Sequence, residues 1–295
     1  MTKEGMEQYL KQARQAITLA VGVALLLTVV KFATGLITHS MAIMASALDS
    51  TLDMLMSALN FFAFRVASKP PDEEHAYGHG KVESLAALFQ SLFIGVSGSF
   101  VIVEAVKRLI QGSYVSDIGL GIGVIVFSGI MTFLLSWRLK VLSKINQSLI
   151  LATEKTHYSM DFVSYIGVIA ALFLVGWTGS VVWDLFVSIL VAAYILKEAI
   201  QILRRAVSEL LDRGLSNTEL KTVRMLILRH HPSIVGVHNL RSRMVGNLVF
   251  LDFHIEIRGE DDFKKAHEMT ESLIDKIKAY HPNADVTVHF DPEGE

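Results

Sequence analysis

Three long segments without a charged side chain decide what this chain can fold into. Residues 84–103, 118–137 and 162–183 contain no aspartate, glutamate, lysine or arginine. A helix rises about 1.5 Å per residue and the hydrocarbon core of a membrane is about 30 Å thick, so a span needs roughly 20 such residues. Each segment is therefore long enough to cross a membrane as a helix.

Further apolar stretches extend this pattern. One covers residues 17–37 with Lys31 inside it, a second covers 40–64 with two aspartates inside it, and a third begins after Asp184. A large soluble helical core is the alternative, but it would not need uninterrupted apolar runs of this length. We predict six transmembrane helices, near residues 14–37, 40–67, 82–111, 117–140, 147–176 and 181–205.

Basic residues gather at one end of the predicted spans, whereas the other end has only Lys107 and Arg108 nearby. Because cytoplasmic segments are enriched in lysine and arginine, we expect both termini in the cytoplasm. The formal net charge of -2 gives no field that would attract nucleic acid. The basic residues at the cytoplasmic end are Lys3, Lys11, Arg14, Arg65, Lys69, Lys81, Arg138, Lys140, Lys144, Arg204 and Arg205.

Composition changes after the last predicted span. Hydrophobic residues make up 52% of the chain, against roughly 45–50% in soluble domains, and the excess lies in residues 1–205. In residues 206–295, segments of helical spacing and segments of strict alternation predict the order helix, strand, strand, helix, strand. We therefore expect an α-helical membrane domain, residues 1–205, followed by a small α+β domain, residues 206–295.

Two predicted spans carry polar side chains at membrane depth. Asp49 and Asp53 lie in the second span, and His157 and Asp161 lie in the fifth. Residues four apart share a helix face, and both pairs lie roughly 13–20 Å into the bilayer. An aspartate there costs on the order of 3 kcal/mol, so these groups are expected to hold a cation or a shared proton. Three carboxylates and one imidazole suit a tetrahedral zinc site.

Two alternatives concern this cluster. The four side chains can instead form a hydrogen-bond network that only holds the helices together. Lys31 is a candidate counter-ion for the carboxylates, but a lysine in the outer half of a span more often extends to the membrane surface, and we favour that interpretation.

A second cluster precedes the third span. Asp72, His75 and His79 have a usable metal-ligand spacing, and Gly78 and Gly80 would let the backbone wrap around an ion. The alternative is a set of solvated side chains in a polar cytoplasmic loop.

The C-terminal domain carries a third candidate site. Alternation places His254, His289 and Asp291 on the polar face of the predicted sheet, with His238 near the first strand and His267 in the second helix. Four histidines and a carboxylate are enough for one or two zinc ions. The alternative is a merely solvated face.

These motifs together resemble the cation diffusion facilitator family, specifically its bacterial YiiP-type branch of ferrous-iron and zinc efflux transporters. The resemblance covers almost the whole chain. It is carried by SALDSTLD at 46–53, PPDEEHAYGHGKVESLAAL at 70–88, HYSMD at 157–161, LLDRGL at 210–215, GVHNLRSR at 236–243, FHIEI at 253–257 and VHFDP at 288–292.

The resemblance implies a homodimer in the inner cell membrane that exchanges a metal ion, zinc, iron(II) or cadmium, for protons. It implies a transport site at Asp49, Asp53, His157 and Asp161, and a loop site at Asp72, His75 and His79. It also implies a cytoplasmic domain of heavy-metal-associated, ferredoxin-like topology. There Asp291 would bridge a binuclear site with His238, His254, His267 and His289, and Lys81 would pair with Asp212 at the junction with the membrane domain.

Two other functions are weaker interpretations. A membrane-bound metal sensor or scaffold that binds without transport would carry the same motifs. An enzyme is not predicted, because the sequence has no His-Glu-x-x-His pair and no serine nucleophile elbow.

Overall fold

The computed structural model describes residues 3–38, 41–111, 119–146, 149–180, 182–246, 248–258 and 263–294. Two compact units are distinguished within it, one formed by Glu7–Val207 and one built around Ser208–Glu295. Each unit has its own hydrophobic core.

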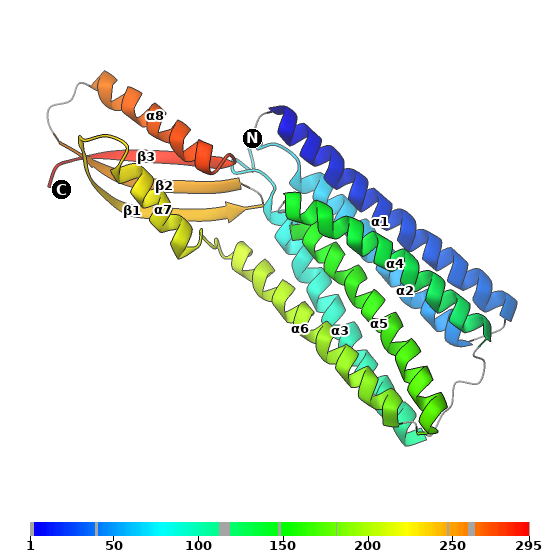
Figure 1. Ribbon diagram of the computed structural model, residues 1–295. Coiled ribbons are helices and arrows are strands. Elements are labelled where there is room, and N and C mark those ends of the chain that lie inside the picture. Colours follow the sequence, from blue (N-terminus) through cyan, green and yellow to red (C-terminus); the bar gives the residue numbers. More distant parts are fainter. Residues whose placement is uncertain are drawn as a thin grey trace. The chain divides into compact units, whose positions relative to one another are not determined.

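The first unit is a bundle of six long helices, as predicted (Figure 1). Among the described residues, five of these helices are long and apolar enough to cross a membrane. The sixth is α2, whose apolar sequence is interrupted by Asp49 and Asp53. The helices are α1 (Lys3–Thr38), α2 (Met41–Ala67), α3 (Lys81–Gln111), α4 (Gly119–Asn146), α5 (Leu149–Thr178) and α6 (Val182–Leu210).

Helices α1 and α6 extend beyond the predicted spans. Helix α1 begins at Lys3, before the expected start near residue 14, and α6 continues to Leu210, past residue 205. Polar residues with good helix propensity can continue a helix into water, so hydropathy marks the span but not the ends of the helix.

Helix α5 lies between two cores of the bundle. Its residues Ile150, Leu151 and Tyr158 pack with α1, α2 and α4, whereas Leu149 and Met160 pack with α3 and α6. The outer surface of the bundle carries large exposed apolar side chains, which suits contact with lipid. Any side chain on the inner faces of α5 is therefore held by neighbours from several helices.

The second unit is a small α+β domain in the predicted order α7 (Asn217–Leu228), β1 (Ile234–Val245), β2 (Leu248–Ile257), α8 (Phe263–Tyr280) and β3 (Ala284–Pro292). The sheet order is β1-β2-β3, with β1 antiparallel and β3 parallel to β2. Along the described chain the elements follow the order helix, strand, strand, helix, strand, which is the chain order of the ferredoxin-like fold without its first strand.

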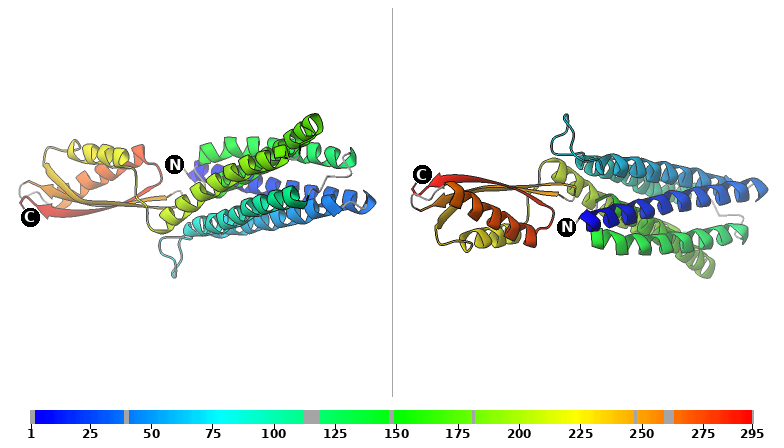
Figure 2. Two further views of the ribbon diagram at one scale, coloured as in Figure 1. Left: turned by 90° about the horizontal axis from the view of Figure 1, so that it is seen from below. Right: turned by 90° about the horizontal axis from the view of Figure 1, so that it is seen from above.

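Both helices of this domain cover the same face of the sheet (Figure 2). Val223 and Ile227 of α7 and Leu273 and Ile277 of α8 pack with Leu251 and alternate apolar residues of β2. The opposite face therefore carries the polar residues of the strands.

A bulge in β1 aligns the histidines on that opposite face. The register shifts between His238 and Arg241, where Asn239 has a φ of 51°. With this register His238 is paired with His254, and His254 with His289. Three histidines thus form a row across the three strands.

Candidate metal centres

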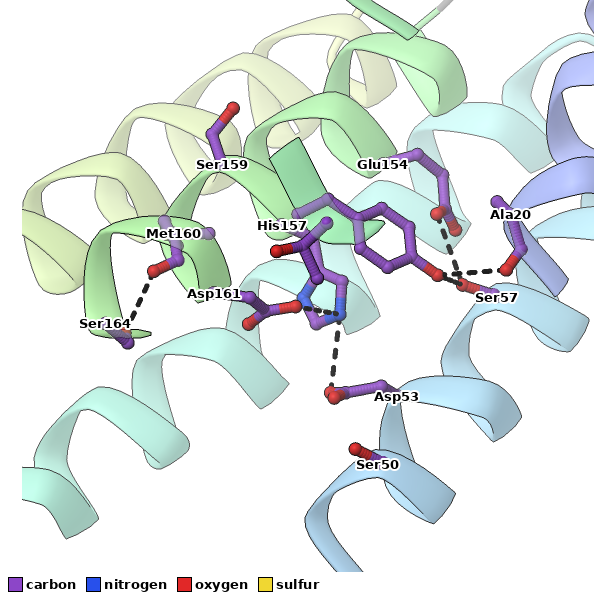
Figure 3. A network of polar contacts seen from close by, with 12 residues as sticks. Ala20, Ser50, Asp53, Ser57, Glu154, His157, Ser159, Met160, Asp161 and Ser164 are labelled. Carbon is purple, nitrogen blue, oxygen red and sulfur yellow. Dashed lines mark hydrogen bonds and ion pairs between the residues drawn. The ribbon is translucent and has the colours of Figure 1, made fainter. Parts of the chain in front are cut away.

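Three side chains from α2 and α5 meet inside the helical bundle (Figure 3). The Nε2 atom of His157 lies 3.3 Å from Oδ1 of Asp53 and 3.7 Å from Oδ2 of Asp161. His157 is buried at 4% exposure, and its Nε2 atom makes no hydrogen bond of acceptable geometry among the described residues. One ligand atom from each residue lies within 4.8 Å of the others, which suits a single bound cation.

A small cavity adjoins this cluster. Residues of α1, α2, α4 and α5 line it, among them Asp53, Asp161 and Tyr165. The two carboxylate side chains are only partly buried, at 18% and 26% exposure. An ion can therefore approach oxygen atoms of both carboxylates while the imidazole stays fixed in the core.

Asp49 does not join this group. It lies one helical turn from Asp53 and is exposed on the surface of the bundle. One turn advances the helix by about 5 Å. His157 and Asp161 of α5 therefore reach Asp53 but not Asp49. The predicted set of four is thus represented by three converging residues.

The expectation that Lys31 extends to the membrane surface is wrong. Lys31 is buried at 2% exposure and donates hydrogen bonds to Ser50 Oγ at 2.7 Å and Tyr165 OH at 3.0 Å. Its charge attracts the carboxylates of Asp53 and Asp161. Lys31 therefore supplies a positive charge beside the cluster, which was the alternative interpretation.

The loop residues Asp72, His75 and His79 also come together. Asp72 Oδ1 lies 3.1 Å from His75 Nδ1, and Asp72 Oδ2 lies 3.3 Å from His79 Nε2. Gly78 adopts a φ of 79°, which lets the loop turn between the two histidines. The backbone N–H of His75 donates to Asp72, and this holds the pKa of Asp72 below its usual range. The ionised carboxylate suits a cation.

In the second unit, Asp291 is the centre of the row of histidines. Its Oδ2 lies 2.9 Å from both His238 Nε2 and His254 Nδ1, and its Oδ1 lies 3.3 Å from His289 Nε2. The hydrogen bond from His254 holds the pKa of Asp291 below its usual range. A carboxylate that contacts three imidazoles through both oxygens has the donor set of a zinc site, and two oxygens allow it to bridge two ions.

His267 does not belong to this group. It is exposed on α8, whose inward residues are Thr270, Leu273 and Ile277. Because α8 covers the apolar face of the sheet, a side chain on its outer side lies away from the row of histidines. The sequence places His267 within the second helix of this domain, but its position along the helix did not show that its side chain would lie away from the sheet.

Both units match known protein families. Residues 17–211 match the cation efflux transmembrane domain, and residues 215–293 match the cation efflux protein cytoplasmic domain. The chain belongs to the cation efflux family. The resemblance to the cation diffusion facilitators, the same family, is therefore confirmed.

Individual members of the cation efflux family resemble the chain over nearly its full length. Cation-efflux pump FieF of Shewanella oneidensis is 34% identical over 287 residues, which are 97% of this chain and 96% of the relative. FieF of Salmonella arizonae is 32% identical over 286 residues, 97% of this chain and 95% of the relative. The metal-bound C-terminal domain of the CzcD transporter from Thermotoga maritima is 28% identical, with a TM-score of 0.26, and the match covers 28% of this chain and 98% of that domain.

This cation efflux protein is accordingly a multi-pass membrane protein of a family of divalent metal cation transporters. Lys81 begins α3 of the membrane unit, and Asp212 follows α6 with a φ of 58°. Their predicted ion pair would join the two units and stays a prediction.

Sequence reasoning missed a buried polar network beside the membrane cluster. Glu154 is 0% exposed and accepts hydrogen bonds from Asn60 Nδ2 at 2.6 Å and Ser57 Oγ at 3.2 Å. Asn60 also donates to Gln90 Oε1 at 2.7 Å. The signal was a glutamate seven residues after the predicted start of the fifth helix, but its partners Ser57 and Asn60 come from α2, and Gln90 of α3 bonds Asn60 in turn.

Proposed function

We propose that this chain exports zinc(II) from the cytoplasm in exchange for protons. The observation that supports this most directly is the convergence of Asp53, His157 and Asp161 inside the membrane bundle of a cation efflux protein. Two carboxylates and an imidazole suit zinc, and also iron(II) or cadmium, better than manganese, which prefers oxygen ligands alone. Asp49 supplies the fourth ligand from the same side of α2 when the helices close around the ion.

Exchange for protons follows from the chemistry of the same ligands. An imidazole nitrogen and a carboxylate must be deprotonated to bind a metal, so each ion that binds releases protons. The membrane helices then expose the site alternately to the two sides of the inner membrane. A more acidic exterior protonates His157 and the aspartates and expels the ion.

The soluble unit is proposed to sense metal and to hold a homodimer together. In this division residues 1–205 form the transport domain and residues 206–295 form the cytoplasmic module, so that both termini lie in the cytoplasm. The short contacts of the Asp291 carboxylate with three histidine nitrogens support a metal site on this module. Metal bound there, or at Asp72, His75 and His79, would bias the dimer towards the transport-competent state.

Reconstitution into liposomes tests the exchange. With zinc outside and an acidic lumen, the purified protein should accumulate zinc, and a protonophore that collapses the pH difference should slow the accumulation. Zinc uptake that ignores the pH difference would contradict proton exchange. Zinc binding without any uptake would instead favour a membrane-bound sensor or scaffold.

A further inference from the structure

Among the described residues, Glu154 is the most completely buried carboxylate of the transport domain that the metal site does not use. It precedes His157 by three residues, about one helical turn, and lies on the side of the cluster towards the beginning of α5. Among the described residues no lysine or arginine forms an ion pair with it. The titratable groups that face it are His157 and Tyr158 on α5 and Asp53 on α2.

A chain of oxygen atoms leads from Glu154 to the backbone of α1. Figure 3 labels Glu154, Ser57 and Ala20 along it. Glu154 Oε2 lies 3.2 Å from Ser57 Oγ, Ser57 Oγ lies 3.0 Å from Tyr158 OH, and Tyr158 OH lies 3.2 Å from the carbonyl oxygen of Ala20. These are three contacts between oxygens in a buried environment. Each needs one hydrogen to be a hydrogen bond.

The hydrogen atoms available to these three oxygen–oxygen contacts can be counted. Ser57 and Tyr158 supply one each, and the carbonyl of Ala20 supplies none. If Glu154 is ionised, two hydrogens serve three contacts, and one pair of oxygens faces each other without a proton. If Glu154 carries a proton, it donates to Ser57, Ser57 donates to Tyr158, and Tyr158 donates to Ala20. The protonated carboxyl therefore satisfies every contact.

The other carboxylate oxygen favours the charged form. Asn60 Nδ2 lies 2.6 Å from Glu154 Oε1 and donates to it. The Oδ1 atom of Asn60 and the Nε2 atom of Gln90 are buried without a hydrogen-bond partner among the described residues. Asn60 and Ser57 thus donate to an ionised carboxylate, and the Ser57 hydroxyl can instead accept from a neutral one, so neither protonation state leaves Glu154 without partners.

A metal ion one turn away changes the balance between these two states. A divalent cation at His157 and Asp161 attracts negative charge on Glu154, because the intervening helix and side chains screen poorly. When the ion leaves, the ionised carboxylate loses a doubly charged neighbour, and a protonated His157 replaces at most one of these two charges. A buried carboxylate whose charge is less well balanced is costly in a membrane interior. Binding of a proton restores neutrality.

We propose that Glu154 is a proton-binding site that is loaded in the metal-free protein and empties when a metal ion enters the neighbouring site. The carboxylic O–H bond breaks, the electron pair stays on the carboxylate, and the proton leaves to water on the side from which the metal came. The reverse step follows release of the metal. This inference rests on the proposed exchange of metal for protons and adds a proton carrier that is not a metal ligand.

Proton release on zinc binding tests the inference. Full-length protein in detergent is titrated with zinc in weakly buffered solution that contains a pH indicator, and bound zinc is counted on the same sample. Glu154→Gln, which mimics the protonated state, should bind as much zinc as the wild type but release up to one proton fewer per chain. Glu83→Gln is the matched control, because Glu83 is a buried carboxylate that accepts from Leu149 N at 3.2 Å, and it should release the wild-type number.

The outcomes separate the two proposals. If the wild type releases no protons when zinc binds, the exchange itself is contradicted. If the wild type releases protons and Glu154→Gln releases the same number with the same zinc count, only the assignment of Glu154 is overturned. Should Glu154→Gln fail to fold, infrared difference spectra of the wild type and Glu154→Asp decide. A protonated-carboxyl band that zinc removes and that Glu154→Asp shifts supports the site, and an unshifted or absent band overturns it.

Discussion

The Nε2 atom of His157 lies 3.3 Å from Oδ1 of Asp53, and this contact joins α5 to α2 within the helical bundle. The same nitrogen faces Asp161 at 3.7 Å. A buried imidazole held between two carboxylates of different helices is a ligand whose position depends on how those helices pack. A change in the angle between α2 and α5 would therefore move Asp53 relative to His157 and Asp161, and the proposed alternating access can use such a change to release the ion.

Replacing His157 should change which metal is carried. The variant His157→Asp makes the ligand set all oxygen, and manganese prefers such sites. We expect the ratio of manganese to zinc transport to rise by about tenfold, equivalent to about 1.4 kcal/mol, as measured by metal-resolved uptake into liposomes. His231→Asp in the second unit is the control and should leave the ratio unchanged. An unchanged ratio in His157→Asp would show that His157 does not contact the transported ion.

Removing the buried charge of Lys31 should strengthen zinc binding. The ammonium group competes with the metal for the same carboxylates, so Lys31→Met is expected to raise zinc affinity by about tenfold, on the order of 1–2 kcal/mol at an effective dielectric constant near 20. Isothermal titration of the detergent-solubilised protein measures this. Lys197→Met, at an exposed position of α6, should leave the affinity unchanged. A folded Lys31→Met protein with unchanged or weaker affinity argues against a counter-ion.

The group formed by Asp291 and the row of histidines in the second unit should regulate the rate of transport without determining which metal is carried. His254→Ala combined with Asp291→Ala removes the central carboxylate and one imidazole, and we expect fewer zinc ions per chain, slower transport and an unchanged preference among metals. Coupling between distant sites is typically about 1–3 kcal/mol, which slows a cycle and seldom stops it. A complete loss of flux in a variant that remains dimeric would mean that the module delivers metal directly. An unchanged zinc count would mean that these residues only form a solvated face.

The depressed pKa of Asp291 predicts a pH dependence for the metal-free protein. A carboxyl group whose pKa is lower in the folded state contributes stability above its unfolded value, near 3.8, and loses it as pH falls through the folded value. Asp291→Asn should therefore be less stable than the wild type from pH 7 to pH 5, and the difference should shrink only below about pH 4. Calorimetry with a chelator present measures both proteins. A difference that disappears by pH 5 would place the responsible group elsewhere.

The fold was largely predictable because its elements have strong local patterns. Uncharged segments of membrane length predicted the spans, and strict alternation within residues 206–295 predicted strands, of which β2 (Leu248–Ile257) is one. The i,i+4 spacing of His157 and Asp161 predicted a shared face, and the comparable depth of Asp53 predicted the helix it would meet. Each of these inferences needs only neighbouring residues and the thickness of a membrane.

Other features depended on packing between helices, which one sequence does not encode locally. Lys31 reads like a residue that extends to the membrane surface until Ser50 and Tyr165 are seen beside it. Glu154 near the start of a span looks like an interfacial residue, but α2 and α3 bring Asn60 and Gln90 over it. In each case the polar partner lies on another helix, and the periodicity of a sequence does not predict contacts between helices.

Zinc flux through Asp161→Asn protein tests the proposed transport site most directly. The substitution keeps the size of the side chain and removes the charge that faces His157, whereas Asp184→Asn makes the same change in the first turn of α6, outside the cluster. Uptake of radioactive zinc into liposomes, with the dimer verified for each protein, gives the comparison. We predict flux at the protein-free background for Asp161→Asn and wild-type flux for Asp184→Asn. Wild-type flux through a correctly folded Asp161→Asn protein would contradict a transport site at Asp53, His157 and Asp161.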